Sequence, residues 1–380
     1  INGVISQAIK KRASDIHFEP YESEFIIRYR IDGILQEVLS QDARIAPLII
    51  SRLKIISRLD ISERRLPQDG RVSLSMGSKN VDVRVSTLPS SYGERIVLRL
   101  LDKQSAQINI DDLGLDQTIL KNYKSTLKAS EGIILVTGPT GSGKTTTLYA
   151  GLRHLSDSSQ NILTVEDPIE YTLQGIGQTQ VNSKTGYNFA AGLRSMLRQD
   201  PDVVMVGEVR DQETARIAIQ ASLTGHLVLS TVHTNSAVGA ITRLRDMGIE
   251  SFLLASSLKT IISQRLVRRL CIECKVTEPV SNIIAKNFNI KNNIEVCTPQ
   301  GCNYCEGTGY FGRIAIAESV QIDPTLKNMI HESASEQDIS KYAFSDNPSI
   351  DELSKSLIIE GLTSSEELFR VTTQKENVSI

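Results

Sequence analysis

The sequence has 380 residues, and at roughly 100 to 200 residues per domain this length predicts two main domains. Hydrophobic residues make up 40% and charged residues 23%, which is the composition of an ordinary folded protein rather than a disordered one. With 42 Lys and Arg against 44 Asp and Glu, the net charge of -2 excludes a global basic field that would attract nucleic acid or acidic lipid.

The sequence shows no sign of a membrane-spanning or exported chain. No apolar run reaches the ~18 residues that span a bilayer, and no signal-like segment follows the start. We therefore expect the chain to stay in the cytoplasm. Because it begins with Ile1 rather than Met, we also expect that a preceding segment, and with it a domain, is missing.

The first segment, residues 1–103, combines short alternating runs with one helical stretch. Runs such as SDIHFEP, EFIIRYRIDGILQEVL and NVDVRVSTLP alternate as strands do, and Asp32-Gly33 is typical of a hairpin turn. Between them, RIAPLIISRLKIISRLD repeats apolar residues at helical spacing. These patterns predict an α+β domain, followed by a polar linker at residues 104–116.

From residue 117 to residue 270, strands alternate with helices. The apolar runs GIILVTG, NILTVED, VVMVGE and HLVLSTVH are nearly unbroken, as expected for strands buried on both faces of a mostly parallel sheet. Helical stretches such as FAAGLRSMLRQ separate them. We therefore predict an α/β domain, followed by a cysteine-bearing lobe at residues 271–312 and a helical region at residues 313–380.

The clearest motif is GPTGSGKTT, which fits the phosphate-loop pattern G-x-x-x-x-G-K-[ST] between an apolar strand and a helical stretch. Its glycines allow successive backbone N–H groups to turn onto phosphate oxygens. We expect Lys144 to reach the β and γ phosphates of ATP and Thr145 to give its hydroxyl to Mg²⁺. The predicted nucleotide-binding residues are Gly138, Pro139, Thr140, Gly141, Ser142, Gly143, Lys144, Thr145 and Thr146.

Two acidic stretches follow strands whose carboxyl ends should lie near the phosphates. TVEDPIEY carries Glu166, Asp167 and Glu170, and DVVMVGEVRD carries Glu208. Capping of a helix is an equal alternative for Asp167, so Glu166 is the preferred contact for metal or water. We expect Glu208 to orient the attacking water, the alternative being an ordinary surface glutamate.

Gly207 occupies the position before Glu208 where many proteins of the phosphate-loop class carry an aspartate. We expect several other groups to share the metal-holding role of that aspartate. Thr145 and the phosphates would hold Mg²⁺ largely through water, and Glu166 would supply a second carboxylate from the neighbouring strand. Glycine would leave room for backbone or water to approach.

TGHLVLSTVHTN places His226 and His233 around one apolar strand. Because strand side chains alternate with period two, both cannot lie on one face, and we expect them to mark the two ends of the strand. His233, beside Thr231 and Thr234, is the better candidate for sensing the γ-phosphate. His226 is equally compatible with nucleotide sensing and with a structural role.

Cys271, Cys274, Cys302 and Cys305 form two C-x-x-C pairs separated by 27 residues. In a cytosolic chain this pattern predicts a tetrahedral zinc site, although the spacer exceeds the usual ~15 to 20 residues and so requires a small lobe of its own. A redox pair is the less favoured alternative. Four cysteine ligands leave no open position, so we assign the metal to folding rather than catalysis.

Several stretches together resemble the secretion-ATPase superfamily that powers type II secretion and type IV pili. They are RASDIHFEP, RRLPQDGR, GPTGSGKTTTLYAGL, TVEDPIEY, LRQDPDVVMVGEVRD, TGHLVLSTVHTN and the paired cysteines. EYTLQGIGQTQVN and NSAVGAITRLRDMGIESFLLASSL are most similar to the type II secretion (GspE-like) branch, with the pilus-assembly (PilB-like) branch as the close alternative. The cysteine lobe fits secretion or assembly ATPases better than retraction ATPases, which lack it.

The resemblance implies a RecA-like ATPase core preceded by a PAS-like α+β domain. It also implies a homo-hexameric motor at the cytoplasmic face of the bacterial inner membrane that drives pseudopilus growth and protein export. Its partners would be an inner-membrane platform protein, a membrane-anchored docking protein and acidic phospholipid. The domain that docks on the membrane-anchored partner is not found in this sequence.

The resemblance also assigns family motifs to this chain. TVEDPIEY corresponds to the aspartate box, VVMVGE to the Walker B stretch and TGHLVLSTVHTN to the histidine box. The first domain of the family contributes arginines to the phosphates, although arginines on strands are more often simply solvated. The matching positions are Arg71, Arg84, Arg95 and Arg99.

A nucleic-acid translocase built on the same nucleotide core is the main alternative function. Such motors usually show a basic stripe or stacking aromatic residues, whereas this chain has no Trp, 5% aromatic residues and balanced charge. We therefore expect no nucleic-acid partner. A small-molecule kinase is also disfavoured, because no acceptor site is recognisable.

Overall fold

The computed structural model describes residues 1–76, 79–101, 108–157 and 159–372. The chain divides into two compact units, Ile1–Gln107 and Ile108–Ile380, each with hydrophobic clusters of its own. None of the helices in the described residues is long and apolar enough to cross a membrane.

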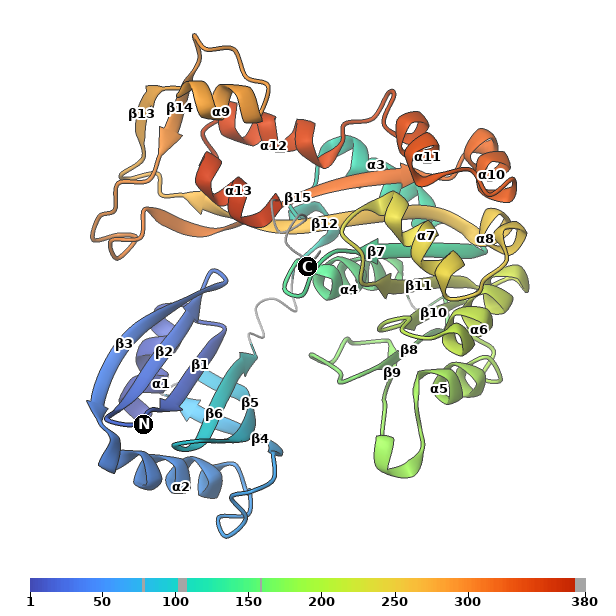
Figure 1. Ribbon diagram of the computed structural model, residues 1–380. Coiled ribbons are helices and arrows are strands. Elements are labelled where there is room, and N and C mark those ends of the chain that lie inside the picture. The colour runs from blue at the N-terminus through green and yellow to red at the C-terminus, as the bar shows by residue number, and fades with distance from the viewer. Residues whose placement is uncertain (77–78, 102–107, 158, 373–380) are drawn as a thin grey trace. The chain divides into compact units, whose positions relative to one another are not determined.

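The first unit is built on a six-stranded antiparallel sheet in the order β3-β2-β1-β6-β5-β4 (Figure 1). Its strands are β1 (Asp15–Pro20), β2 (Glu24–Ile31), β3 (Ile34–Asp42), β4 (Gln68–Met76), β5 (Lys79–Ser90) and β6 (Gly93–Leu101). Its helices are α1 (Asn2–Lys10), η1 (Ala43–Ile45) and α2 (Ala46–Ile56). The predicted hairpin turn is confirmed at Asp32 and Gly33, whose φ angles are 46° and 87°.

Alternation along the strands separates an apolar face of this sheet from a charged one. Ile16 and Phe18 of β1 lie in the core with Ile5 of α1 and Leu53 of α2. Glu19 takes the alternate position, where it pairs with arginines of the neighbouring strands. The predicted α+β character of this unit is thus confirmed.

The second unit is built on a seven-stranded sheet in the order β15-β12-β7-β11-β10-β8-β9 (Figure 1). All neighbouring strands are parallel except β12 and β15. The strands are β7 (Gly132–Thr137), β8 (Ile162–Glu166), β9 (Gly177–Gln180), β10 (Val203–Val206), β11 (Leu227–Val232), β12 (Leu258–Leu270) and β15 (Tyr310–Gln321). The mostly parallel sheet predicted from the unbroken apolar runs is confirmed.

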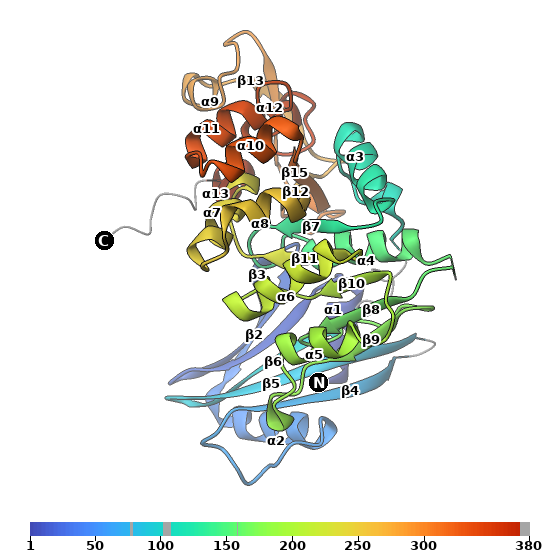
Figure 2. The same ribbon diagram turned by 90° about the vertical axis from the view of Figure 1, so that its right-hand side faces the viewer.

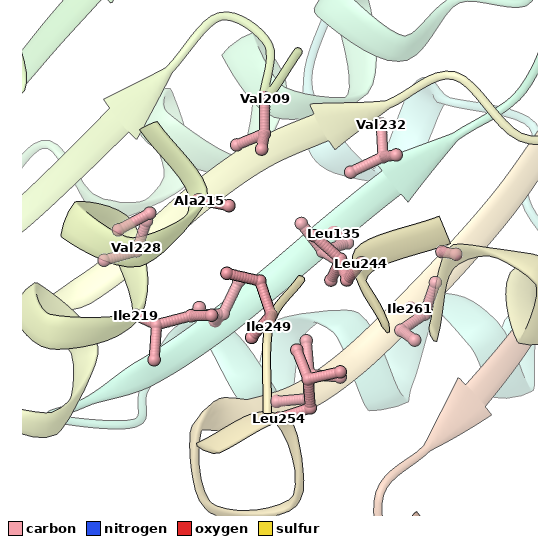
Figure 3. Close-up of a cluster of buried hydrophobic side chains, with 14 of the residues drawn as sticks. Leu135, Val209, Ala215, Ile219, Val228, Val232, Leu244, Ile249, Leu254 and Ile261 are labelled. Carbon is pink, nitrogen blue, oxygen red and sulfur yellow. The ribbon is translucent and has the colours of Figure 1, made fainter. Parts of the chain in front are cut away.

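Helices cover both faces of this sheet (Figure 2). One layer holds α5 (Phe189–Met196), α6 (Gln212–Leu223), α7 (Ala237–Asp246), α8 (Ser251–Ser257), α10 (Pro324–His331) and α11 (Glu336–Ala343). The other holds η3 (Ile110–Asp112), α3 (Gln117–Leu127) and α4 (Lys144–Leu155), while η4 (Ser183–Thr185) lies between β9 and α5. Leu135 of β7 faces the first layer and Val136 the second, because strand side chains alternate. Figure 3 shows Leu135 in the first core with Ile219 of α6 and Leu244 of α7.

The cysteine lobe contains β13 (Val276–Pro279), α9 (Asn282–Asn287) and β14 (Glu295–Thr298), and the C-terminal helices are α12 (Ile350–Ile359) and α13 (Ser365–Thr372). Ala285 and Val296 of the lobe share a hydrophobic cluster with Val267 of β12 and Leu368 of α13. The lobe is therefore packed on the sheet and the C-terminal helices rather than standing on its own.

The stretch predicted as a linker contributes in part to the second unit. Ile110 and Leu115 are buried in a cluster with residues of α3 and α4. Residues 102–107 lie outside the described residues. The sequence did not reveal this packing, because the few apolar residues of this polar stretch form no long periodic pattern.

The region predicted as helical from residue 313 begins as a strand. β15 extends to Gln321 and pairs along the edge of the main sheet with β12, and the first C-terminal helix begins at Pro324. Residues 310–321 form a strand because they pair with β12, some fifty residues earlier in the chain, and the local sequence does not predict this long-range pairing. The helical character of the rest of the C-terminal segment is confirmed through Thr372.

Candidate functional site

The phosphate loop connects the carboxyl end of β7 to the first turn of α4. Gly138, Gly141 and Gly143 have φ angles of 140°, 78° and 89°, which residues with side chains rarely adopt. A Cβ atom on Gly138 would also lie 2.2 Å from the backbone oxygen of Gln264. The glycines therefore allow both the shape of the loop and the close approach of β12.

Lys144 folds back over this loop. Its Nζ donates hydrogen bonds to the backbone oxygens of Gly138 at 2.8 Å and Pro139 at 3.0 Å. Burial lowers the pKa of Lys144, and the nearby carboxylate of Glu208 opposes that shift. The following residue, Thr145, is exposed at the start of α4. Both side chains can thus turn toward a phosphate chain bound on the loop.

Glu208 follows β10 and contacts two basic side chains. It pairs with Arg210, and its Oε2 lies 3.4 Å from Nε2 of His233 beyond the end of β11. Burial and the charge of Lys144 lower the pKa of His233, and Glu208 opposes this shift. Because β7, β11 and β10 are parallel neighbours, their carboxyl ends bring Lys144, Glu208 and His233 together. Arg210 was not among the predicted site residues.

The backbone around Gly207 is closely packed. Gly207 N donates to Val165 O at 2.8 Å, and Gly207 O accepts from Thr231 Oγ1 at 2.9 Å. A Cβ atom on Gly207 would lie 3.3 Å from Val165 O and 3.5 Å from a ring carbon of Phe189. The room that glycine leaves is therefore used by the backbone of β8, and the alternative that water approaches there is not supported.

Glu166 lies in a buried polar cluster whose hydrogen bonds go to Tyr149, Thr164 and Gln178 rather than to the residues around Glu208. Its carboxylate accepts hydrogen bonds from the hydroxyl of Tyr149, from Thr164 Oγ1 at 2.5 Å and from Gln178 Nε2 at 3.1 Å. Glu166 is 3% exposed, and burial raises its pKa while these hydrogen bonds oppose the shift. This arrangement does not fit the expected second carboxylate for a metal.

Asp167, the next residue, is the acid of this stretch whose charge acts on the Glu208–Arg210 pair. It is exposed, and its charge adds to that of Glu208 in raising the pKa of Arg210. β8 is followed by β9 without an intervening helix, so the helix-capping alternative for Asp167 is not met. Of the two adjacent acids, Asp167 rather than Glu166 is therefore the one that acts electrostatically on Arg210.

His226 lies at the opposite end of β11 from His233, which confirms that the two histidines mark the ends of the strand. β11 runs parallel to β7, so its amino end is at the edge of the sheet away from the phosphate loop. There, Nδ1 of His226 lies 2.9 Å from Ala221 O. Seven residue steps along the strand separate the histidines by about 23 Å. The structure therefore does not bring His226 into the nucleotide site of its own chain.

Gln264 of β12 braces the phosphate loop and was not among the predicted site residues. Its Nε2 donates to Ser142 O at 2.9 Å, and its Oε1 accepts from Thr147 Oγ1 at 2.7 Å. Nothing in the sequence singles it out, because β12 reads LKTIISQRLVRRL and Gln264 is one of several polar residues in it.

The four predicted arginines all lie on strands of the first unit: Arg71 on β4, Arg84 on β5, and Arg95 and Arg99 on β6. Arg99 Nε lies 3.0 Å from Asp15 Oδ1, and Arg95 pairs with Glu19. Asp15 and Glu19 are both buried. A phosphate that binds these two arginines must therefore compete with carboxylates of the same unit.

The four predicted cysteine ligands converge, with all Sγ atoms within 4.8 Å of one another. Cys271 and Cys302 are 3.9 Å apart, and Cys274 and Cys305 are 3.7 Å apart. Sulfurs placed tetrahedrally at about 2.3 Å from Zn²⁺ would be about 3.8 Å apart. Although burial opposes it, backbone N–H groups of Cys302 and Gly309 lower the pKa of Cys305 to about 6. The donor set and its spacing fit a closed zinc site.

The chain matches the Type II/IV secretion system protein family over residues 1–370. The chain belongs to this family. Type II secretion system protein E of Pseudomonas aeruginosa is 53% identical over 381 residues, which cover 99% of this chain and 75% of that protein. Type II secretion system ATPase E of Vibrio cholerae is 52% identical over 376 residues, which cover 98% and 75%.

Two solved structures share the architecture of this chain. The pilus retraction motor PilT with bound ADP is similar with a TM-score of 0.66 and 25% identity, over 100% of this chain and 98% of that one. The ATPase DotB of Yersinia pseudotuberculosis shares the fold, with a TM-score of 0.73 and 20% identity over 98% and 93%. The resemblance to secretion ATPases inferred from the motifs is thus confirmed for this member of the Type II/IV secretion system family.

Proposed function

We propose that this protein hydrolyses ATP to drive pseudopilus growth and protein export in type II secretion. The observation that carries the proposal is the convergence of Lys144, Glu208 and His233 beside a glycine-rich loop. Relatives more than 50% identical are named as type II secretion proteins, which supports this system. Pilus assembly is the second candidate, because a pilus motor shares the fold.

Binding would rest on the loop and the first turn of α4. The backbone N–H groups of residues 138–146 would surround the phosphates. Lys144 Nζ would give up its hydrogen bonds to two loop carbonyl oxygens and donate to phosphate oxygens instead. The exposed hydroxyl of Thr145 would hold Mg²⁺, which when bound neutralises charge on the phosphates.

Glu208 would accept a hydrogen bond from water and aim its oxygen at the γ-phosphorus. The new P–O bond forms as the bond to the bridging oxygen breaks, and the proton that the water loses passes to the carboxylate of Glu208, so that ADP and phosphate are released. Arg210 and His233 hold the carboxylate of Glu208 in the arrangement described above, and Asp167 balances part of the charge of Arg210.

The working assembly would be a homo-hexamer at the cytoplasmic face of the bacterial inner membrane. Its partners would be the platform protein, the membrane-anchored docking protein and acidic phospholipid, with no nucleic acid. The first unit would supply Arg71, Arg84, Arg95 and Arg99 to the phosphates. Zn²⁺ at the four cysteines would stabilise the lobe rather than act on ATP.

The test is ATP hydrolysis measured against oligomer size by size-exclusion chromatography. Turnover should follow the hexamer fraction and rise when the cytoplasmic domain of the platform protein and vesicles containing acidic phospholipid are added. Vesicles of neutral phospholipid are the control. Stimulation by DNA or RNA, but not by the platform domain with acidic lipid, would overturn the proposal in favour of a nucleic-acid translocase.

A further inference from the structure

Gln264 joins the phosphate loop to the helix that follows it. Gln264 is 3% exposed, and both the oxygen and the nitrogen of its side-chain amide form hydrogen bonds. Nε2 donates to Ser142 O in the loop at 2.9 Å, while Oε1 accepts from Thr147 Oγ1 in the first turn of α4 at 2.7 Å. Thr147 is itself fully buried, so neither hydrogen bond is exposed to competing water.

Strand pairing explains why Gln264 reaches the loop. β12 runs parallel to β7, with Ile262 opposite Val136 and Ser263 opposite Thr137. Thr137 is the last residue of β7. Gln264 therefore lies one position beyond the end of β7, where that chain turns into the phosphate loop.

The loop backbone also approaches Gln264 at its first and last glycines. A Cβ atom on Gly138 would lie 2.2 Å from Gln264 O, and one on Gly143 would lie 2.7 Å from Gln264 Nε2. A glutamate at this position would place an acceptor against the oxygen of Ser142, and a methionine would satisfy neither partner. The site is therefore matched to an amide of this length.

We propose that Gln264 is a positioning residue that holds the phosphate loop ready for ATP before ATP arrives. The inference rests on the proposed function, because it concerns the same nucleotide site. A loop that is already ordered loses less conformational entropy when it binds phosphate. Without the amide, ATP must order the loop, whereas Lys144 and Glu208 still reach the bound phosphates. ATP affinity should therefore fall more than turnover at saturation.

Gln264→Met tests this inference, with Gln321→Met as the matched control. Gln321 on β15 also accepts a hydrogen bond from a threonine hydroxyl, that of Thr260, at 2.7 Å. Thr260 lies on β12 four residues before Gln264, away from the phosphate loop. The readouts are KM and kcat for Mg²⁺-ATP, the Kd of a slowly hydrolysed ATP analogue, and amide hydrogen exchange of residues 138–147 without nucleotide.

Gln264→Met should raise KM and Kd at least about tenfold, change kcat by less than about threefold, and speed exchange in the loop. Gln321→Met should leave the Kd and the loop exchange at the wild-type values. Unchanged Kd and loop exchange in Gln264→Met would overturn the inference, and so would an equal effect of Gln321→Met.

Thr147→Val is the second test, to be used if Gln264→Met does not fold. It removes the hydroxyl that donates to Gln264 Oε1 and keeps nearly the same side-chain shape. It should weaken ATP binding and speed loop exchange in the same way, and wild-type behaviour of this variant overturns the inference. Failure of the proposed function is a different result, in which the wild-type hexamer does not hydrolyse ATP at all.

Discussion

Nε2 of His233 lies 3.4 Å from Oε2 of Glu208, although the two residues follow different strands of the sheet. Arg210, two residues after Glu208, contacts the same carboxylate. Glu208 is 13% exposed on its side chain, whereas His233 is 52% exposed. The carboxylate is thus held by its neighbours, while the imidazole can respond to solvent and to a bound phosphate.

Glu208→Gln should retain ATP binding and lose turnover. The amide keeps the size of the side chain but cannot accept a proton from water, so kcat should fall at least about 100-fold. The Kd of ATP should stay within about threefold, since the loop and Lys144 make the binding contacts. Glu213→Gln, which alters an exposed pair with Arg194 on the surface, is the matched control. Turnover near the wild-type value in Glu208→Gln would remove Glu208 from the water-orienting role.

The position of Asp167 predicts that it matters more than Glu166. Asp167→Asn removes a charge that balances Arg210, which strengthens the hold of Arg210 on Glu208 and should lower kcat roughly fivefold. Glu166→Gln keeps an acceptor for Tyr149 and should change kcat by less than about threefold. Steady-state kinetics of both variants decides the point. A loss in Glu166→Gln as large as that in Glu208→Gln would restore the role expected from the sequence.

The lowered pKa of His233 predicts that kcat depends on pH below pH 6.5. Burial and Lys144 lower the pKa of His233 from 6.5, so the imidazole is neutral at neutral pH and becomes charged only in more acid solution. The charged form pairs more strongly with Glu208, so kcat should fall as the pH drops below 6.5. In His233→Asn this part of the acid limb should disappear from the profile of kcat against pH.

Stability should follow the same titration. The unfolded chain binds a proton on His233 at higher pH than the folded chain does, so the folded state loses stability as the pH falls from 6.5 to the lowered pKa. His233→Asn should show a smaller drop in Tm across this window. His154→Asn changes an exposed histidine of α4 and should behave as wild type. Identical kcat and Tm profiles for His233→Asn and wild type would contradict both expectations.

Cys302→Ser should release the metal from the cysteine lobe. It removes one of four thiolate ligands, so bound zinc measured by atomic absorption should fall at least about tenfold. Loss of the lobe also disturbs the cluster shared with β12 and α13, so residues 271–312 should become sensitive to protease. Cys297→Ser changes the thiol beside Thr277 that is outside the ligand set, and should keep its zinc. Equal zinc in Cys302→Ser and wild type would show that the ligand set is wrong.

Local sequence patterns were enough to predict the phosphate loop, the parallel sheet and the cysteine cluster. The phosphate loop could be recognised because its glycine spacing, lysine and flanking strand and helix are all close in sequence. The parallel sheet followed from apolar runs such as Ile133 to Val136, since strands buried on both faces leave no polar alternation. The zinc site could be predicted on the single assumption that the two C-x-x-C turns lie close together in the fold.

Other features depended on contacts between distant segments. β15 is a strand because it pairs with β12, and its sequence alone did not distinguish it from the helices that follow. Glu166 and Asp167 are adjacent, yet the turn after β8 buries one and exposes the other. Their order along the chain could not show which of them faces Arg210.

The sequence by itself determined the class of fold, the family, the nucleotide loop and the cysteine set, because each depends on residues at short and regular spacing. Only the tertiary structure decided that Gln264 braces the loop, that Asp167 lies beside the Glu208 group, and that His226 lies at the far edge of the sheet. The physical reason is that strand register and side-chain direction bring together residues such as Gln264 and Ser142, which are more than a hundred positions apart, and no local sequence pattern predicts such contacts.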